Sequence, residues 1–143
     1  MPAIYSHRLT VQPDEIDRLG HANNLVYLRW MLDAAVAHST AQSWDSKAYE
    51  ELGAVFVVRS HQIEYLRPAF AAEEVVVLTW VASFRRASSV RRYEMRRASD
   101  GKVLATAATE WAFVDLATRL PTRIHPRVLA AFEVAPDGPP EAT

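Results

Sequence analysis

The pattern of hydrophobic and polar residues along the chain distinguishes one long helical stretch from several extended segments. Residues 25–41 are apolar on nearly every side in their first half, which is typical of a helix buried on several sides. Asn23 or Asn24 can cap its start by accepting a hydrogen bond from the free N–H groups of the first turn. Residues 4–12 before this helix are predicted to be extended, and residues 44–52 after it form a second short helix or a loop.

The second half of the chain carries the two-residue alternation of β-strands. Tyr93 and Met95, for example, lie opposite Arg92 and Glu94 in this pattern. The predicted strands are residues 55–66, 75–83, 90–97 and 103–115. Asp100-Gly101 is a hairpin-turn dipeptide, and such short turns favour antiparallel pairing. The pattern therefore predicts an α+β domain in which an antiparallel β-sheet wraps around one long central helix.

The ends of the chain set the expected limits of this domain. A short final helix is predicted over residues 126–132, and the proline-rich stretch 134–143 predicts a disordered tail. We find no repeat and no linker, so residues 1–133 are expected to form a single domain. A sheet with two open edges favours self-association, and a homo-oligomer is expected.

Composition narrows the classes of function. The chain has 143 residues, a formal net charge of -1 and no cysteine. A near-neutral protein does not attract nucleic acid or an anionic membrane through its overall charge, and thiolate chemistry is excluded. Neither a signal peptide nor a membrane-spanning stretch is apparent, which predicts a cytoplasmic protein. No histidine–carboxylate spacing suits a metal, so none is expected.

The most informative segment lies directly before the long helix and carries one carboxylate, Asp17, ahead of a glycine, a histidine and two asparagines. The first-turn N–H groups and the helix dipole favour negative charge, so a thioester carbonyl placed there could develop an oxyanion. Asp17 could then activate water as general base, or attack as nucleophile. Aspartate and asparagine also cap turns and helices commonly, and spacing alone favours that structural interpretation.

Several motifs resemble the 4-hydroxybenzoyl-CoA thioesterase-like family of hotdog proteins. The first is Asp17-Arg-Leu-Gly-His-Ala-Asn-Asn-Leu-Val-Tyr-Leu-Arg-Trp30, which is similar to the family's aspartate, Gly-His, Asn-Asn and tyrosine pattern. The others follow in the family's order: Ile63–Ala69, Arg85-Arg86-x-Ser88, Asp100-Gly101, and Trp111–Asp115 with Thr118-Arg119. Five motifs in register along most of the chain make the resemblance specific.

The resemblance implies a hotdog fold and hydrolysis of acyl-CoA or acyl-ACP thioesters to a free acid and a thiol. It implies that Asp17 is the catalytic carboxylate, that the backbone N–H near Asn24 is the oxyanion donor, and that His21 and Tyr27 have supporting roles. Some related acyl-ACP thioesterases use an asparagine two residues after the aspartate, where this chain has Leu19, and other relatives have a histidine in place of Asn24. The roles beyond Asp17 are therefore left open.

A group of arginines could bind the phosphates of coenzyme A, which would be part of the substrate and not a separate cofactor. Guanidinium groups suit phosphate oxygens, and in relatives paired arginines at this turn reach the CoA nucleotide. The predicted phosphate-binding residues are Arg85, Arg86, Ser88, Arg119 and Arg123. The cluster also includes Arg91, Arg92, Arg96 and Arg97. A solvated strand face is an equally open interpretation for Arg85 and Arg86, and it is favoured for Arg92 and Arg96.

Two other functions compete with thioester hydrolysis. A non-catalytic hotdog module could hold acyl-CoA in the same cleft as a sensor or carrier. A dehydratase would require a paired histidine and carboxylate in another sequence context, and it ranks last. Acyl-chain preference, the CoA or ACP carrier, the general-base or nucleophile role of Asp17, and the choice between dimer and tetramer are not determined by the sequence.

Overall fold

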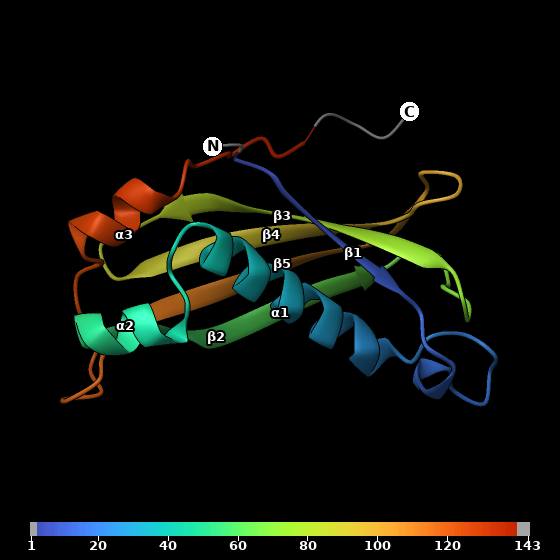
Figure 1. Ribbon diagram of the computed structural model, residues 1–143, viewed down its shortest axis with the longest axis horizontal. Helices are drawn as coiled ribbons and strands as arrows, with labels where there is room; N and C mark the ends of the chain where they lie inside the picture. Colours follow the sequence, from blue (N-terminus) through green and yellow to red (C-terminus); the bar gives the residue numbers. More distant parts are fainter. Residues whose placement is uncertain (1–2, 140–143) are drawn as a thin grey trace.

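A five-stranded antiparallel sheet with one helix across its face makes up most of the computed structural model, which describes residues 3–139 (Figure 1). The strand order is β1-β3-β4-β5-β2. The strands are β1 (Tyr5–Thr10), β2 (Ala54–Tyr65), β3 (Glu74–Phe84), β4 (Ser88–Arg97) and β5 (Val103–Asp115). The helices are α1 (Asn24–Ala41), α2 (Ser46–Leu52) and α3 (Pro126–Ala131), with a short 3-10 helix, η1 (Pro13–Glu15), before α1. None of the helices within residues 3–139 is long and apolar enough to cross a membrane.

The strands follow the alternation that the sequence contains. Tyr93 and Met95 are buried against α1, whereas Arg92 on the opposite face is exposed. On that face Arg96 forms an ion pair with Glu94 at 2.9 Å, and both side chains are half-buried. The predicted antiparallel sheet is therefore observed, and each predicted strand lies within two residues of its observed bounds.

Helix α1 buries one face and leaves another exposed. Its buried residues recur at helical spacing and pack over β1 and β3: Tyr27, Trp30, Met31, Ala34, Ala35 and His38. Leu25 is 75% exposed and Val36 63% exposed. The helix is 18 residues long, about 27 Å at the usual rise per residue. The sequence predicted a helix that is buried on several sides, but in this chain α1 is buried on one side only.

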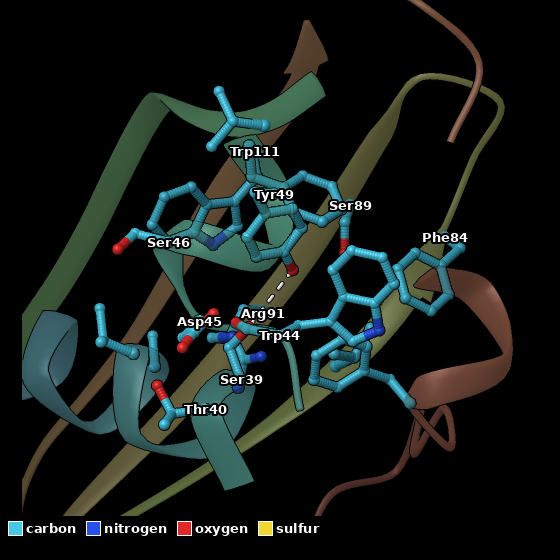
Figure 2. A pocket seen from close by; sticks show the side chains of 16 residues that line it. Ser39, Thr40, Trp44, Asp45, Ser46, Tyr49, Phe84, Ser89, Arg91 and Trp111 are labelled. Atoms are coloured by element: carbon cyan, nitrogen blue, oxygen red, sulfur yellow. Dashed lines mark hydrogen bonds between the residues drawn. The ribbon is translucent and has the colours of Figure 1, made fainter. Parts of the chain in front are cut away.

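A second cluster of buried side chains lies under α2 and α3, at the end of the sheet away from η1 (Figure 1). Asp45 caps α2, and Gly53, with φ of +87°, ends it in the left-handed conformation that glycine adopts readily. Between this cluster and the last turns of α1 is a cavity of about 300 Å³ (Figure 2). The cavity is therefore at the opposite end of α1 from Asp17.

The segment after α3 differs from the sequence-based expectation. Val134 forms a bridge with Val81 of β3, and the Ala135 N–H donates to the Val81 carbonyl at 2.9 Å. Gly138 packs so tightly on Trp80 that a Cβ there would lie 2.6 Å from the ring. The first part of the predicted disordered tail thus has defined contacts. Trp80 offers an apolar surface on which this segment packs, and the alternation pattern did not predict that packing. Residues 140–143 lie outside the described part.

Candidate functional site

Asp17 lies in a tight loop that leads directly into α1. Ile16 and Ala22 pair as an antiparallel bridge, and between them the Asp17 N–H donates to the His21 carbonyl at 3.0 Å. The Gly20 N–H donates back to the Asp17 carbonyl at 3.0 Å, with Gly20 at a φ of +89° that side chains rarely adopt. The loop therefore holds Asp17 and His21 beside the helix start, as the sequence predicted.

The start of α1 presents backbone donors. Asn23 is the N-cap, and its side-chain oxygen accepts from the Leu25 N–H at 2.9 Å. Asn24 is the first helical residue and is exposed. Within residues 3–139 its N–H has no hydrogen-bond acceptor. An exposed first-turn N–H at the positive end of a helix is suited to a carbonyl oxygen that gains negative charge.

The Asp17 carboxylate has one structural contact. Its Oδ1 accepts the Leu19 N–H at 2.9 Å and so stabilises the turn, which is the capping role that the sequence had also allowed. Its other oxygen accepts no hydrogen bond from residues 3–139, and the side chain is half-buried. His21 is also half-buried, and its Nδ1 lies 3.3 Å from the Ala22 carbonyl. One carboxylate oxygen of Asp17 is thus left for a ligand or a water.

Two tyrosines near the helix start differ in burial. Tyr27 is 2% exposed, its ring packs against Trp30 and Tyr65, and burial raises its pKa. It is a core residue, and its supporting role in the reaction stays a prediction. Tyr65 is 42% exposed, and its hydroxyl donates to the Asn24 carbonyl at 3.0 Å. The position of Tyr65 on an edge strand is what brings it to the surface.

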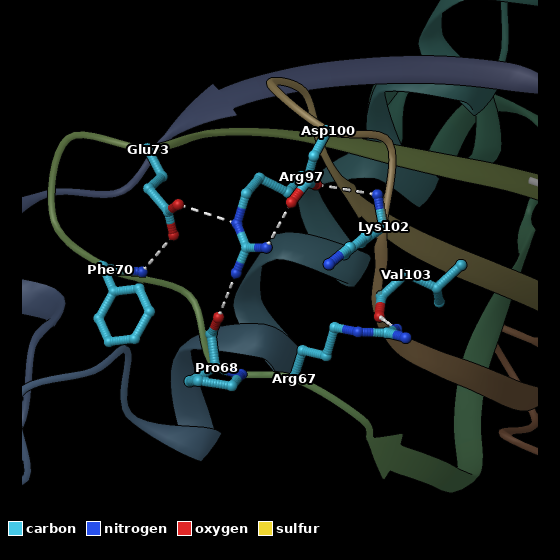
Figure 3. Close-up of polar contacts among 8 residues, drawn as sticks. All are labelled: Arg67, Pro68, Phe70, Glu73, Arg97, Asp100, Lys102 and Val103. Atoms are coloured by element: carbon cyan, nitrogen blue, oxygen red, sulfur yellow. Dashed lines mark hydrogen bonds and ion pairs between the residues drawn. The ribbon is translucent and has the colours of Figure 1, made fainter. Parts of the chain in front are cut away.

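A network of charged residues fixes the β2–β3 loop, on which the helix start rests. The Ala22 N–H donates to the Ala69 carbonyl of this loop at 2.8 Å. Arg97 at the end of β4 lies 2.8 Å from Glu73 and 3.0 Å from Asp100, and its Nη2 donates to the Pro68 carbonyl at 2.8 Å (Figure 3). Arg97 is therefore a structural residue that positions the loop under the start of α1.

The predicted phosphate-binding residues gather at the other end of the sheet. Arg85 and Arg86 are exposed in the β3–β4 turn, which the Arg85 N–H closes by donating to the Ser88 carbonyl at 2.8 Å. The Ile124 N–H donates to the Arg86 carbonyl at 2.8 Å, so exposed Arg123 lies beside this turn. Arg119 is exposed in the loop after β5, with a φ of +61°. The structure thus brings the arginine turn and Arg123 together.

The two groups of predicted residues are far apart within one chain. The β2–β3 loop beside Asp17 precedes β3, and the arginine turn follows it. Because β3 has 11 residues, the two ends are about 33 Å apart at the usual rise per strand residue. One chain therefore does not bring Asp17 and Arg85 to one small site.

Comparison with known proteins identifies relatives of this fold. The profile of the thioesterase-like superfamily matches residues 11–132. No curated protein matches the sequence. Similar solved structures include an acyl-ACP thioesterase from Bacteroides thetaiotaomicron, with 23% identity and a TM-score of 0.86 over 97% of this chain. The chain spans only 56% of that protein, and 54% of a similarly matched chain from Lactobacillus plantarum.

Two further structures match over most of both chains. A 1,4-dihydroxy-2-naphthoyl-CoA thioesterase from Synechocystis has 16% identity and a TM-score of 0.83, over 90% of this chain and 94% of its own. A hypothetical protein from Staphylococcus aureus in complex with CoA has 15% identity and a TM-score of 0.84, over 90% of this chain and 80% of its own. At these identities the likeness establishes the fold. The sequence-based expectation of a hotdog-like thioesterase fold is thereby confirmed.

Proposed function

The chain belongs to the thioesterase-like superfamily, and from this premise we propose that it hydrolyses acyl thioesters of CoA or acyl carrier protein at Asp17. The observation that carries the proposal is the half-buried Asp17 beside the exposed, unbonded N–H of Asn24 at the start of α1. A carboxylate and an oxyanion donor are the two groups that this hydrolysis requires.

In the proposed reaction the thioester carbonyl oxygen accepts a hydrogen bond from the Asn24 N–H. The free oxygen of Asp17 takes a proton from a water whose oxygen attacks the carbonyl carbon. The C–S bond then breaks, and the proton passes from Asp17 to the leaving sulfur, which gives the acid and the thiol and restores the carboxylate. Alternatively the Asp17 oxygen attacks directly, and water hydrolyses the resulting anhydride. Both routes use the same carboxylate oxygen, and His21 and Tyr65 would support the helix start.

We further propose that a second copy of the chain completes the site. Arg85, Arg86 and Arg123 would bind the CoA phosphates, and they lie at the opposite end of β3 from Asp17. A two-fold partner that runs antiparallel to the first chain would place its arginine turn near the first chain's Asp17. The exposed apolar Leu25 and Val36 on α1 support such a contact.

A non-catalytic acyl-CoA-binding module remains the competing function. It is favoured by the hydrogen bond from Leu19 to Asp17, because this contact gives the aspartate a structural purpose without chemistry. The two functions differ in whether thiol is released.

The test is a thiol-release assay over a panel of acyl-CoA and acyl-ACP substrates with Asp17→Asn. An asparagine side chain keeps the oxygen that accepts from Leu19, so the turn is retained. We expect kcat/KM to fall by about 100-fold or more, the usual effect of losing a general base. Asp14→Asn in η1 is the matched control and should keep full activity. An unchanged rate in Asp17→Asn would remove this residue from the mechanism, and CoA binding without thiol release would favour the binding module.

A further inference from the structure

The cavity at the end of α1 has an apolar wall and one buried charge. It holds about 300 Å³, room for about ten water-sized atoms. Figure 2 shows aromatic side chains from several elements around it. The aromatic lining residues are Trp44, Tyr49, Phe56, Phe84, Trp111 and Phe132. A cavity with such a lining suits the apolar part of a ligand, and the polar groups of the cavity determine which polar group the ligand carries.

The buried charge is Arg91 of β4, which lines the cavity and is 6% exposed. Its Nη1 donates to Nδ1 of His38 at 2.9 Å and to the Thr79 hydroxyl at 3.1 Å. The guanidinium carbon lies 5.9 Å from the centre of the Phe132 ring. Within residues 3–139 its Nε and Nη2 groups have no acceptor. The side of the planar guanidinium that carries Nε and Nη2 is therefore free to donate two hydrogen bonds to a ligand.

No negative charge neutralises Arg91 in the described part of the chain. None of the ion pairs includes it, although the carboxylate of Asp45 is at the rim of the cavity. Asp45 instead caps α2 by accepting the Ala48 N–H at 2.9 Å. Burial together with the charge of Arg91 lowers the pKa of His38 to about 4, so His38 is neutral near pH 7. A buried charge without a counter-charge is unfavourable, which an anionic ligand would relieve.

Three hydroxyl groups of the cavity wall are already engaged. The Ser39 hydroxyl donates to the Trp44 carbonyl at 2.6 Å and lies 3.2 Å from the Tyr49 hydroxyl. The Ser89 hydroxyl donates to the Ser83 carbonyl at 3.0 Å. The charged donor of the cavity with free N–H groups is Arg91, and a carboxylate fits the two parallel N–H groups of a guanidinium.

We propose that this cavity binds the carboxylate of an organic acid whose apolar body has about ten non-hydrogen atoms. The carboxylate contacts the free side of Arg91, and the body packs among the aromatic rings. The same chemistry can come from a free acid or from a distal carboxylate on the acyl group of a thioester. The second source rests on the proposed hydrolytic function in a dimer, because Asp17 of the same chain lies at the other end of α1 and a second chain has to supply the reacting aspartate. The first source does not rest on it.

The first arm of the test measures binding to the wild-type protein. 3-Phenylpropionate and its neutral amide are titrated by calorimetry, with the fluorescence of Trp44 and Trp111 as a second readout. We expect the acid to bind at least tenfold more tightly than the amide. Equal affinity for the two, or no binding of either at millimolar concentration, would overturn the proposal without any variant being needed.

The second arm assigns the preference to Arg91. Arg91→Met keeps the length of the side chain without its charge and should remove the preference for the acid, while Arg91→Lys should keep part of it. If Arg91→Met does not fold, Arg91→Lys and Arg91→Gln are compared in its place. A full preference for the acid in a folded variant that has no charge at this position would contradict the proposal.

The third arm separates the two sources and the two proposals. Asp17→Asn should leave binding of the acid unchanged even if it abolishes hydrolysis, so the cavity and the hydrolytic site fail independently. If the carboxylate belongs to the substrate, Arg91→Met lowers kcat/KM at least tenfold for a thioester with a distal carboxylate and leaves its methyl ester unaffected. Binding of the free acid without this effect identifies the free acid as the ligand.

Discussion

The two ends of α1 differ in how they are built. At its start, exposed backbone donors and a half-buried carboxylate are held in place by short loops and by the ion pairs of Arg97. At its other end, aromatic side chains enclose a cavity in which the charge of Arg91 is buried. Under our two proposals, the first end serves a reaction that uses water, and the second binds an apolar ligand away from water.

The proposed dimer predicts that a complete hydrolytic site needs Asp17 from one chain and the arginine turn, Arg85 and Arg86, from the other. Asp17→Asn and the double variant Arg85→Ala, Arg86→Ala should each lose activity, the first by about 100-fold or more. In a mixed dimer one site would combine the intact Asp17 of one chain with the intact arginines of the other. After unfolding and refolding the two variants together, about a quarter of wild-type activity should return, because half of the dimers are mixed and each has one intact site.

The measurement is thiol release at substrate concentrations below KM, where binding of the phosphates affects the rate. Each variant refolded alone is the control. If the mixture is no more active than the sum of its parts, the arginine turn does not complete a partner's site, and the two ends act separately.

The cavity end should be sensitive to acid. The pKa of His38 is about 4 in the folded protein and about 6.5 when unfolded, so between these values the unfolded chain binds a proton that the folded chain does not. Folding stability attributable to His38 is therefore complete above pH 6.5 and falls by up to roughly 3 kcal/mol as the pH drops to 4.

Denaturant unfolding of the wild type and of His38→Gln at pH 7, 5.5 and 4.5 measures this loss. Carboxylates contribute equally to both proteins, so the difference between the two curves isolates His38. The glutamine oxygen can still accept from Arg91. A constant difference across this range would show that His38 does not resist protonation.

The sequence predicted much of the fold because alternation and turn residues act locally. The strand around Tyr93 and the hairpin at Asp100 follow from their neighbours alone. The motif from Asp17 to Trp30 also placed the carboxylate at the start of α1, because seven residues and one glycine turn leave little freedom.

The cavity could not be predicted in the same way, since its walls come from elements far apart in the chain. One indication was present: Arg91 has the same parity as Tyr93 and Met95, which the pattern assigned to the buried face. The alternation therefore indicated a buried arginine, but the neighbouring arginines favoured the interpretation that Arg91 belongs to a solvated strand face. The sequence contains no comparable signal for the contact of Gly138 with Trp80, because a proline-rich composition does not reveal what the segment packs against.

The smallest predicted effects come from the two helix caps, which match in chemistry and differ in place. Asn23 caps α1 and Asp45 caps α2, each by accepting one backbone N–H at 2.9 Å. Alanine at either position should lower the free energy of unfolding by about 1 kcal/mol, the usual cost of losing a cap. Only Asn23→Ala should also lower turnover, because fraying of α1 moves the donor that faces the carbonyl oxygen. Unfolding and thiol-release measurements on both variants decide this: equal turnover at equal loss of stability would mean that the start of α1 takes no part in the reaction.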